Sequence, residues 1–70
     1  PFMSKENIVL FYAHLERDPE LRRKAMSFQE IYEKQEDVID AFINFAEKLG
    51  YEFTFREFME HMYSQARERE

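Results

Sequence analysis

The chain has 70 residues, no cysteine and a formal net charge of −5 at pH 7, which allow one small domain and exclude disulfides and thiolate zinc sites. The acidic balance argues against nucleic acid or anionic membrane as a partner, and a single glycine excludes a glycine-rich phosphate loop. Hydrophobic residues make up 44% and charged residues 36%, and with one glycine and two prolines there is little turn material, so we expect helices and not hairpins.

The N-terminal residues bear on the compartment in which the protein works. Met3-Ser4-Lys5 reads as a natural start, so we interpret Pro1-Phe2 as an addition outside the fold. The sequence has neither a signal-peptide pattern nor an apolar run long enough to span a bilayer. We therefore predict a cytoplasmic protein with a single domain over residues 1–70.

The first predicted helix covers about residues 5–17. Ser4 can cap its first turn. One helix face carries apolar residues at the i, i+3, i+4 and i+7 positions, namely Ile8, Phe11, Tyr12 and Leu15. Asp18-Pro19-Glu20 then supplies a cap, a proline at the first helical position and a carboxylate near the positive end of the helix dipole. A second helix is predicted to start at residue 19.

The middle of the chain, residues 19–49, has one continuous helical pattern of apolar residues. One long helix is compatible with this pattern, and so are two helices, because Ser27 with Glu30 forms a capping-box pattern and Asp37 can also cap a helix. We favour a bend or short loop near residues 34–37. This break gives helices at about 19–34 and 37–49, and the second of them is apolar enough to be the buried central helix.

The last predicted helix covers residues 55–67, and the charged tail at residues 67–70 is expected to fray. Gly50 can end the preceding helix in the left-handed conformation, with Tyr51 folding back onto it. Thr54 and Glu57 form a capping box. Phe53 and Phe58 occupy the two positions of a hydrophobic staple. The fold class is therefore all-α, a small bundle of three to four helices.

The residues that could carry chemistry are few. His14 and His61 have no partner at the spacing of a known metal motif, and we interpret His61 as a solvated residue on the polar side of its helix. The serines either have capping roles or lack an adjacent base. We therefore predict no enzyme activity, no metal, no cofactor and no small-molecule substrate.

Several stretches together resemble a known family. They are Met3-Ser4-Lys5-Glu6, the positions Ile8, Phe11 and Leu15, Asp18-Pro19-Glu20-Leu21, and Ala46-Glu47-Lys48-Leu49-Gly50-Tyr51-Glu52-Phe53-Thr54. In this order they are similar to the nif-eleven-type leader domain, a family named after a nitrogen-fixation operon protein and related to nitrile-hydratase-like leaders. Compared with that pattern, this chain carries about two additional helical turns within residues 26–37.

The resemblance implies a docking role. Such leaders are bound by a peptide-modifying enzyme, which then acts on an attached core peptide, so the second binding event becomes intramolecular. Leaders of this kind usually end in a double glycine followed by the core peptide, and neither occurs before Glu70. The alternative is a free-standing adaptor or accessory protein, linked to nitrogen fixation, that associates with itself.

A partner-binding surface is expected on the first and last predicted helices. In the first helix the positions between the core residues are apolar at Val9, Leu10 and Ala13, and His14 stands beside them. In the last helix the candidates are Met59, Met62 and Tyr63. A helix that is apolar nearly all round is covered on more than one side, so we expect a homodimer or a bound enzyme there. The alternative is that the segment around Phe28 and Tyr32 covers this face within one chain.

Overall fold

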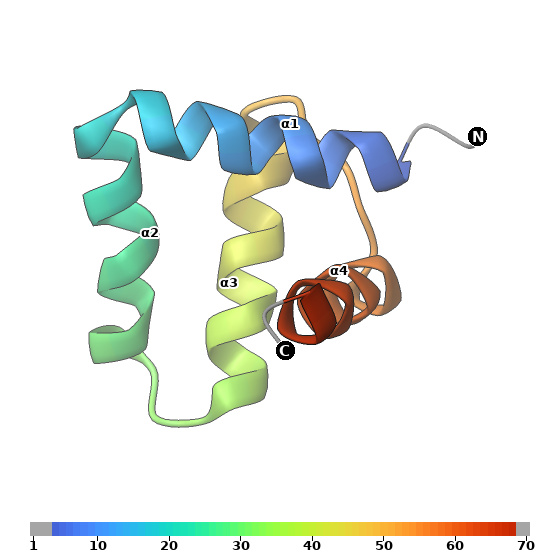
Figure 1. Cartoon of the computed structure of the whole chain (residues 1–70). Coiled ribbons are helices and arrows are strands. Elements are labelled where there is room, and N and C mark those ends of the chain that lie inside the picture. The colour runs from blue at the N-terminus through green and yellow to red at the C-terminus, as the bar shows by residue number, and fades with distance from the viewer. Residues whose placement is uncertain (1–3, 69–70) are drawn as a thin grey trace.

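The computed structural model describes residues 4–68, and this range forms four helices and no strand (Figure 1). The helices are α1 at Ser4–Arg17, α2 at Pro19–Ile31, α3 at Gln35–Lys48 and α4 at Phe55–Glu68. The predicted all-α bundle is confirmed, with boundaries shifted by a few residues at most. Pro1-Phe2 and the last residues of the predicted frayed tail lie outside the described range, whereas residues 67 and 68 are helical.

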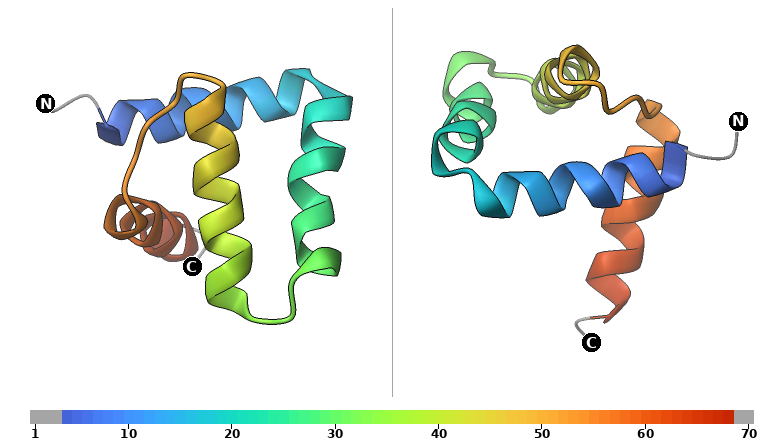
Figure 2. Two further views of the ribbon diagram at one scale, coloured as in Figure 1. Left: turned by 180° about the vertical axis from the view of Figure 1, so that it is seen from behind. Right: turned by 90° about the horizontal axis from the view of Figure 1, so that it is seen from above.

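The four helices are arranged around α1. α2 and α3 run antiparallel to each other, and α1 lies across one end of that pair (Figures 1 and 2). α4 projects away from the pair, as the view from above shows (Figure 2). α1 packs against both α2 and α4, so the N-terminal helix joins the two halves of the bundle.

The N-terminal cap of α2 is described by the structure, and that of α1 is not. α1 already includes Ser4, and the capping role predicted for that side chain lies outside what the structure describes. α2 begins as predicted. The Asp18 carboxylate accepts a hydrogen bond from the backbone N–H of Leu21 at 3.1 Å, and Pro19 occupies the first turn, where its missing N–H costs no hydrogen bond.

The helical conformation is interrupted between α2 and α3 at residues 32–34. The prediction of two helices in place of one long helix is therefore confirmed. Tyr32 and Lys34 both have extended backbone conformations, with ψ of 135° at each, so neither continues a helix. The break therefore falls slightly before the predicted range of 34–37.

Neither predicted cap makes this break. The Ser27 hydroxyl donates to the Lys24 carbonyl at 2.6 Å, inside a helix that continues to Ile31, so Ser27 caps nothing. Asp37 lies in the first turn of α3, and the residue at the cap position, Lys34, makes no side-chain cap hydrogen bond. The prediction of Ser27 or Asp37 as a cap is wrong, because serine and aspartate also occur within helix turns.

The end of α3 is a glycine-dependent turn, as predicted. Gly50 has φ of +98°, a conformation that side-chain-bearing residues rarely adopt. Its N–H donates to the Glu47 carbonyl at 3.0 Å, and the N–H of Tyr51 donates to the Ala46 carbonyl at 2.9 Å. These two hydrogen bonds form a Schellman motif, which turns the chain back so that Tyr51 packs against the core.

The capping box at the start of α4 is also confirmed. The Thr54 N–H donates to the Glu57 carboxylate at 2.8 Å, and the Glu57 N–H donates to the Thr54 hydroxyl at 3.1 Å. The staple residues Phe53 and Phe58 meet at Phe42, against which both rings pack, with centroid distances of 6.4 Å and 5.5 Å. The connection from α3 to α4 is thus fixed by polar and apolar contacts together.

Thr54→Ala combined with Glu57→Ala is expected to lower the free energy of unfolding by about 1 kcal/mol or more, because both reciprocal cap bonds are lost. Urea denaturation followed by circular dichroism measures the change. Ser64→Ala with Glu68→Ala is the matched control, since both side chains are exposed on the same helix, and it should shift stability by less than about 0.5 kcal/mol. An equal loss in both double variants would contradict the capping role.

The hydrophobic core forms where α1, α3 and the segment after Gly50 meet. Its buried cluster contains Ile8, Phe11, Leu15, Ala46 and Phe53. Phe11 is 0% exposed, and its ring centroid lies within 6.5 Å of five other aromatic rings, those of Tyr12, Phe42, Phe45, Tyr51 and Phe53. The predicted core face of the first helix is therefore confirmed, whereas the predicted buried central helix, α3, has only Ile39 and Ala46 buried, and α1 is the helix that joins the two halves of the bundle.

Candidate partner-binding groove

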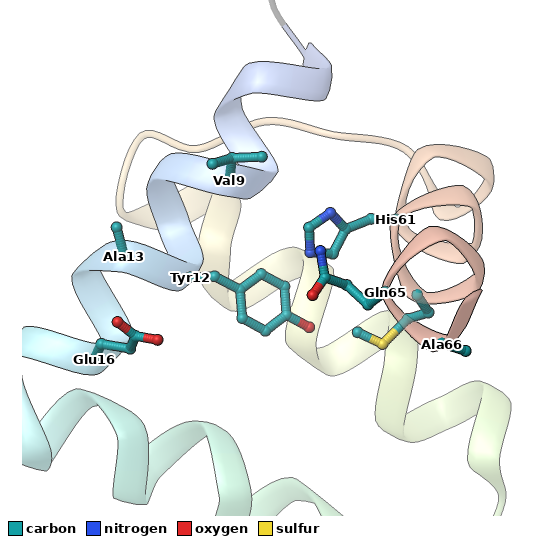
Figure 3. A pocket seen from close by; sticks show the side chains of 8 residues that line it. Val9, Tyr12, Ala13, Glu16, His61, Gln65 and Ala66 are labelled. Carbon is teal, nitrogen blue, oxygen red and sulfur yellow. The ribbon is translucent and has the colours of Figure 1, made fainter. Parts of the chain in front are cut away.

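A groove lies between α1 and the part of α4 that projects from the bundle (Figure 3). Its volume is about 660 Å³. Both helices contribute lining residues: Val9, Tyr12, Ala13 and Glu16 from α1, and His61, Met62, Gln65 and Ala66 from α4. α4 projects away from the α2–α3 pair (Figure 2). As a result, no further helix within residues 4–68 covers the space between α1 and α4, and a groove remains there.

Tyr12 forms the link between the groove and the core. Its ring packs against Phe42 at a centroid distance of 5.8 Å and stacks on His61 at 5.1 Å, with an interplanar angle of 21°. Burial raises the pKa of Tyr12 to about 12, so the phenol stays protonated at neutral pH. Figure 3 shows the ring extending from α1 toward α4. Tyr12 thus presents a neutral polar group at the base of the groove.

The position of His61 differs from the predicted one. We expected a solvated histidine on the polar side of the last helix, but the side chain is only half-exposed and lies flat against Tyr12. α4 approaches α1 at this point, so a position that looks polar in the helix pattern becomes a contact between helices. His61 is therefore part of the groove wall.

A second hollow adjoins the groove. It has a volume of about 380 Å³ and lies between α1, α2 and α3, with α4 at its border. Tyr12, Glu16 and Met62 line both hollows. The two hollows thus adjoin at these three residues, and their linings together include residues of all four helices.

Three of the predicted partner-binding residues meet in the groove: Val9, Ala13 and Met62. Leu10 is 55% exposed, nearly the same as Val9 at 54%, but it lies further round α1 and is not a lining residue. Met59 and Tyr63 are exposed on α4 and also lie outside the groove lining. Tyr63 lines a separate shallow hollow near the end of α4, where the Arg67 guanidinium lies 5.9 Å from its ring centroid.

His14 lies on another side of α1, away from the groove lining. Its Nδ1 is 3.0 Å from the Tyr51 hydroxyl, and its Nε2 is 3.9 Å from the Asp18 carboxylate. The Asn7 side chain donates to the Glu52 carbonyl at 3.0 Å nearby. These contacts tie α1 to the turn after α3 and to the cap of α2, which is a structural role for His14.

Phe28 and Tyr32 do not cover the apolar face of α1. The Phe28 ring packs edge-on against Phe45 of α3 at 5.6 Å, and Tyr32 is exposed at the end of α2. The alternative of a cover within one chain is therefore wrong. The residues between α2 and α3 extend the helical pair away from α1, so they cannot reach Val9 or Leu10 (Figure 1).

The sequence interpretation missed five groove residues: Tyr12, Glu16, His61, Gln65 and Ala66. A usable signal was present, because Val9, Ala13 and Glu16 follow the i, i+4, i+7 spacing of one helix stripe. The stripe alone cannot show which other helix it faces. That depends on the direction in which α4 leaves the bundle.

Residues 3–58 match the model of the Nif11 domain. The chain belongs to the Nif11 domain family. This is the leader-peptide family of ribosomally made, post-translationally modified peptide precursors. No curated protein and no solved structure matches the chain.

The family match covers only part of the groove. In this Nif11 domain it runs from the start of α1 to Phe58 in the first turn of α4. The α1 wall lies inside the matched range, whereas the α4 wall, formed by His61, Met62, Gln65 and Ala66, lies beyond it. The groove is therefore completed by residues outside the matched range.

Within residues 4–68, no three histidine, cysteine or acidic side chains lie together so that they could hold a metal ion. None of the helices in that same range is both long and apolar enough to cross a membrane.

Proposed function

We propose that this chain is a non-catalytic docking domain, bound by a peptide-modifying enzyme that acts on a peptide attached to it. The observation that carries the proposal is the match of residues 3–58 to a family of precursor leaders. Binding of the domain would raise the effective concentration of the attached peptide at the enzyme. In this proposal the chain works in the cytoplasm, where its precursor is made.

The use of the polar side chains supports a non-catalytic role. The Asp18 side chain caps α2, and Thr54 and Glu57 cap α4. The Ser27 hydroxyl donates a hydrogen bond to the Lys24 carbonyl within α2. The His14 side chain is hydrogen-bonded to the Tyr51 hydroxyl. These polar groups are thus engaged in holding the fold.

A fusion experiment tests the proposal. The peptide-modifying enzyme encoded in the same gene cluster is incubated with a peptide rich in Ser, Thr and Cys, either free or fused to the C-terminus of the chain. The fused peptide is expected to be modified about 10²-fold to 10⁴-fold more efficiently, because its encounter with the enzyme becomes intramolecular. Mass spectrometry measures the modified fraction over time.

The control for this experiment is the same fusion with a scrambled sequence in place of residues 3–68. Equal modification of the free and fused peptides would contradict the proposal, and so would a gene cluster that encodes no peptide-modifying enzyme.

A self-associating adaptor remains the competing function. Each copy carries a formal charge of −5, so electrostatic repulsion works against a homodimer at low salt.

A further inference from the structure

We infer that the groove between α1 and α4 accepts a basic amphipathic helix of the modifying enzyme, with aliphatic side chains between Val9 and Met62 and a lysine or arginine opposite Glu16. This inference rests on the proposed function and adds to it the surface and the chemistry of the partner. Three observations support it: the shape of the groove, its apolar lining residues and its charge.

The shape suits a helix. The groove runs between two helices, α1 and α4, is open to solvent, and shares Tyr12, Glu16 and Met62 with the adjoining hollow. A row of side chains at i, i+3, i+4 and i+7 fills a groove of this kind. Residues 4–68 contain no strand, so this domain offers no sheet edge there to which an extended segment could add.

The lining offers apolar contacts around a polar base. Val9 is 54% exposed in the free chain, so a partner side chain can reach it. Ala13 and Ala66 are small and leave room between the two helices (Figure 3). Met62 is an adaptable side chain that fits different aliphatic shapes. The Tyr12 phenol, protonated at neutral pH, is a hydrogen-bond donor at the base.

Charge identifies the occupant. Glu16 is the carboxylate among the groove's lining residues, and it forms no ion pair with the side chains of residues 6–68. Arg22 lines the adjoining hollow beside Glu16, but its guanidinium is bound to the Leu15 and Glu16 carbonyls at the end of α1. An acidic or second identical partner would place like charges together, because the chain itself carries −5. A basic helix would instead be attracted to the domain and would pair with Glu16. The charge therefore favours a cationic partner over a second copy.

The end of the family match adds a consequence for selectivity. The α4 wall lies beyond Phe58, the last residue matched to the family. Two domains that share the matched residues can differ in this wall. The groove would therefore distinguish the enzyme that recognises this chain from enzymes that recognise other members.

The test compares neighbouring positions of α1 with equal exposure. Val9→Lys and Leu10→Lys each place a lysine on the surface and change the net charge equally, but only Val9 lines the groove. Calorimetric titration into the enzyme is expected to show at least about tenfold weaker binding for Val9→Lys. Leu10→Lys should bind within about twofold of the wild-type chain. Circular dichroism should show the same helix content in both.

The charge is tested separately. Glu16→Lys is expected to weaken binding about tenfold at low salt, and Glu16→Gln should reduce the salt dependence of binding. Glu47→Lys is the matched control, because Glu47 is an exposed residue that lines a different hollow at the C-terminal end of α3. It should leave the affinity within about twofold of the wild-type value.

Each outcome decides the inference. If Val9→Lys and Leu10→Lys weaken binding equally, the groove is not the docking surface, although the proposed function stands. If the wild-type chain does not bind the enzyme, both the inference and the proposed function fail. If ultracentrifugation shows a dimer that Val9→Lys dissociates, a second copy occupies the groove, and the inference is wrong.

Discussion

Phe11→Ala is expected to lower the free energy of unfolding by about 3–5 kcal/mol, the usual cost of removing a buried phenylalanine ring. Phe11 is 0% exposed and has five aromatic neighbours, so its removal leaves a cavity that α1 cannot close without losing its contacts with α3. A core in a chain of this size supplies only about 3–5 kcal/mol in total. The variant should therefore be largely unfolded at room temperature.

Circular dichroism and urea denaturation measure this effect, and Phe55→Ala is the matched control. Phe55 starts α4 and is 48% exposed, so the same substitution there should cost less than about 1 kcal/mol. A Phe11→Ala chain that keeps the wild-type unfolding midpoint would show that the aromatic cluster does not hold the bundle together.

Ala46→Leu should cost about 1–3 kcal/mol for the opposite reason, overpacking. Ala46 is 0% exposed, and its carbonyl accepts the hydrogen bond from Tyr51 that closes the turn after α3. A larger side chain at this position pushes against Phe11 and Phe53 in the buried cluster. The turn cannot move aside, because its path is set by the backbone of Gly50.

Thermal unfolding of Ala46→Leu checks this expectation, with Ala13→Leu as the control. Ala13 is exposed on α1, so leucine at that position should change the free energy of unfolding by less than about 0.5 kcal/mol. A stabilised Ala46→Leu variant would mean that the core contains unfilled space at the crossing of α1 and α3.

The parts of the fold that the sequence predicts well are those with local causes. The Asp18 cap, the Gly50 turn and the box of Thr54 with Glu57 each join atoms only a few residues apart. Local signals of this kind are visible in the sequence without knowledge of the tertiary structure. The helix ends that they define, at residues 17, 19 and 55, match the structure.

The break between α2 and α3 shows where local signals are insufficient. Ser27 and Asp37 both fit a capping pattern, yet α2 continues past the first and α3 begins before the second. The cap position is occupied by Lys34, which supplies no capping oxygen. The antiparallel packing of α2 on α3 sets this boundary, and that packing is a tertiary property.

The groove was predictable only in part. Val9, Ala13 and Met62 were expected on a contact surface because their apolar side chains exceed what the core needs. Tyr12 was assigned to the core alone and His61 to solvent, whereas the structure stacks one on the other. The crossing of α1 and α4 brings them together, and helix periodicity contains no information about that crossing.

The position of α1 across the end of the bundle has a consequence for the order of folding. Its central side chain, Phe11, packs on Phe42, Phe45 and Phe53, all from the second half of the chain. Synthesis proceeds from the amino terminus, so α1 leaves the ribosome well before these partners. The hairpin of α2 and α3 can form by closing a short loop, whereas the docking of α1 closes a long one. During translation the apolar face of α1 therefore stays incompletely covered until Phe53 emerges and the core closes.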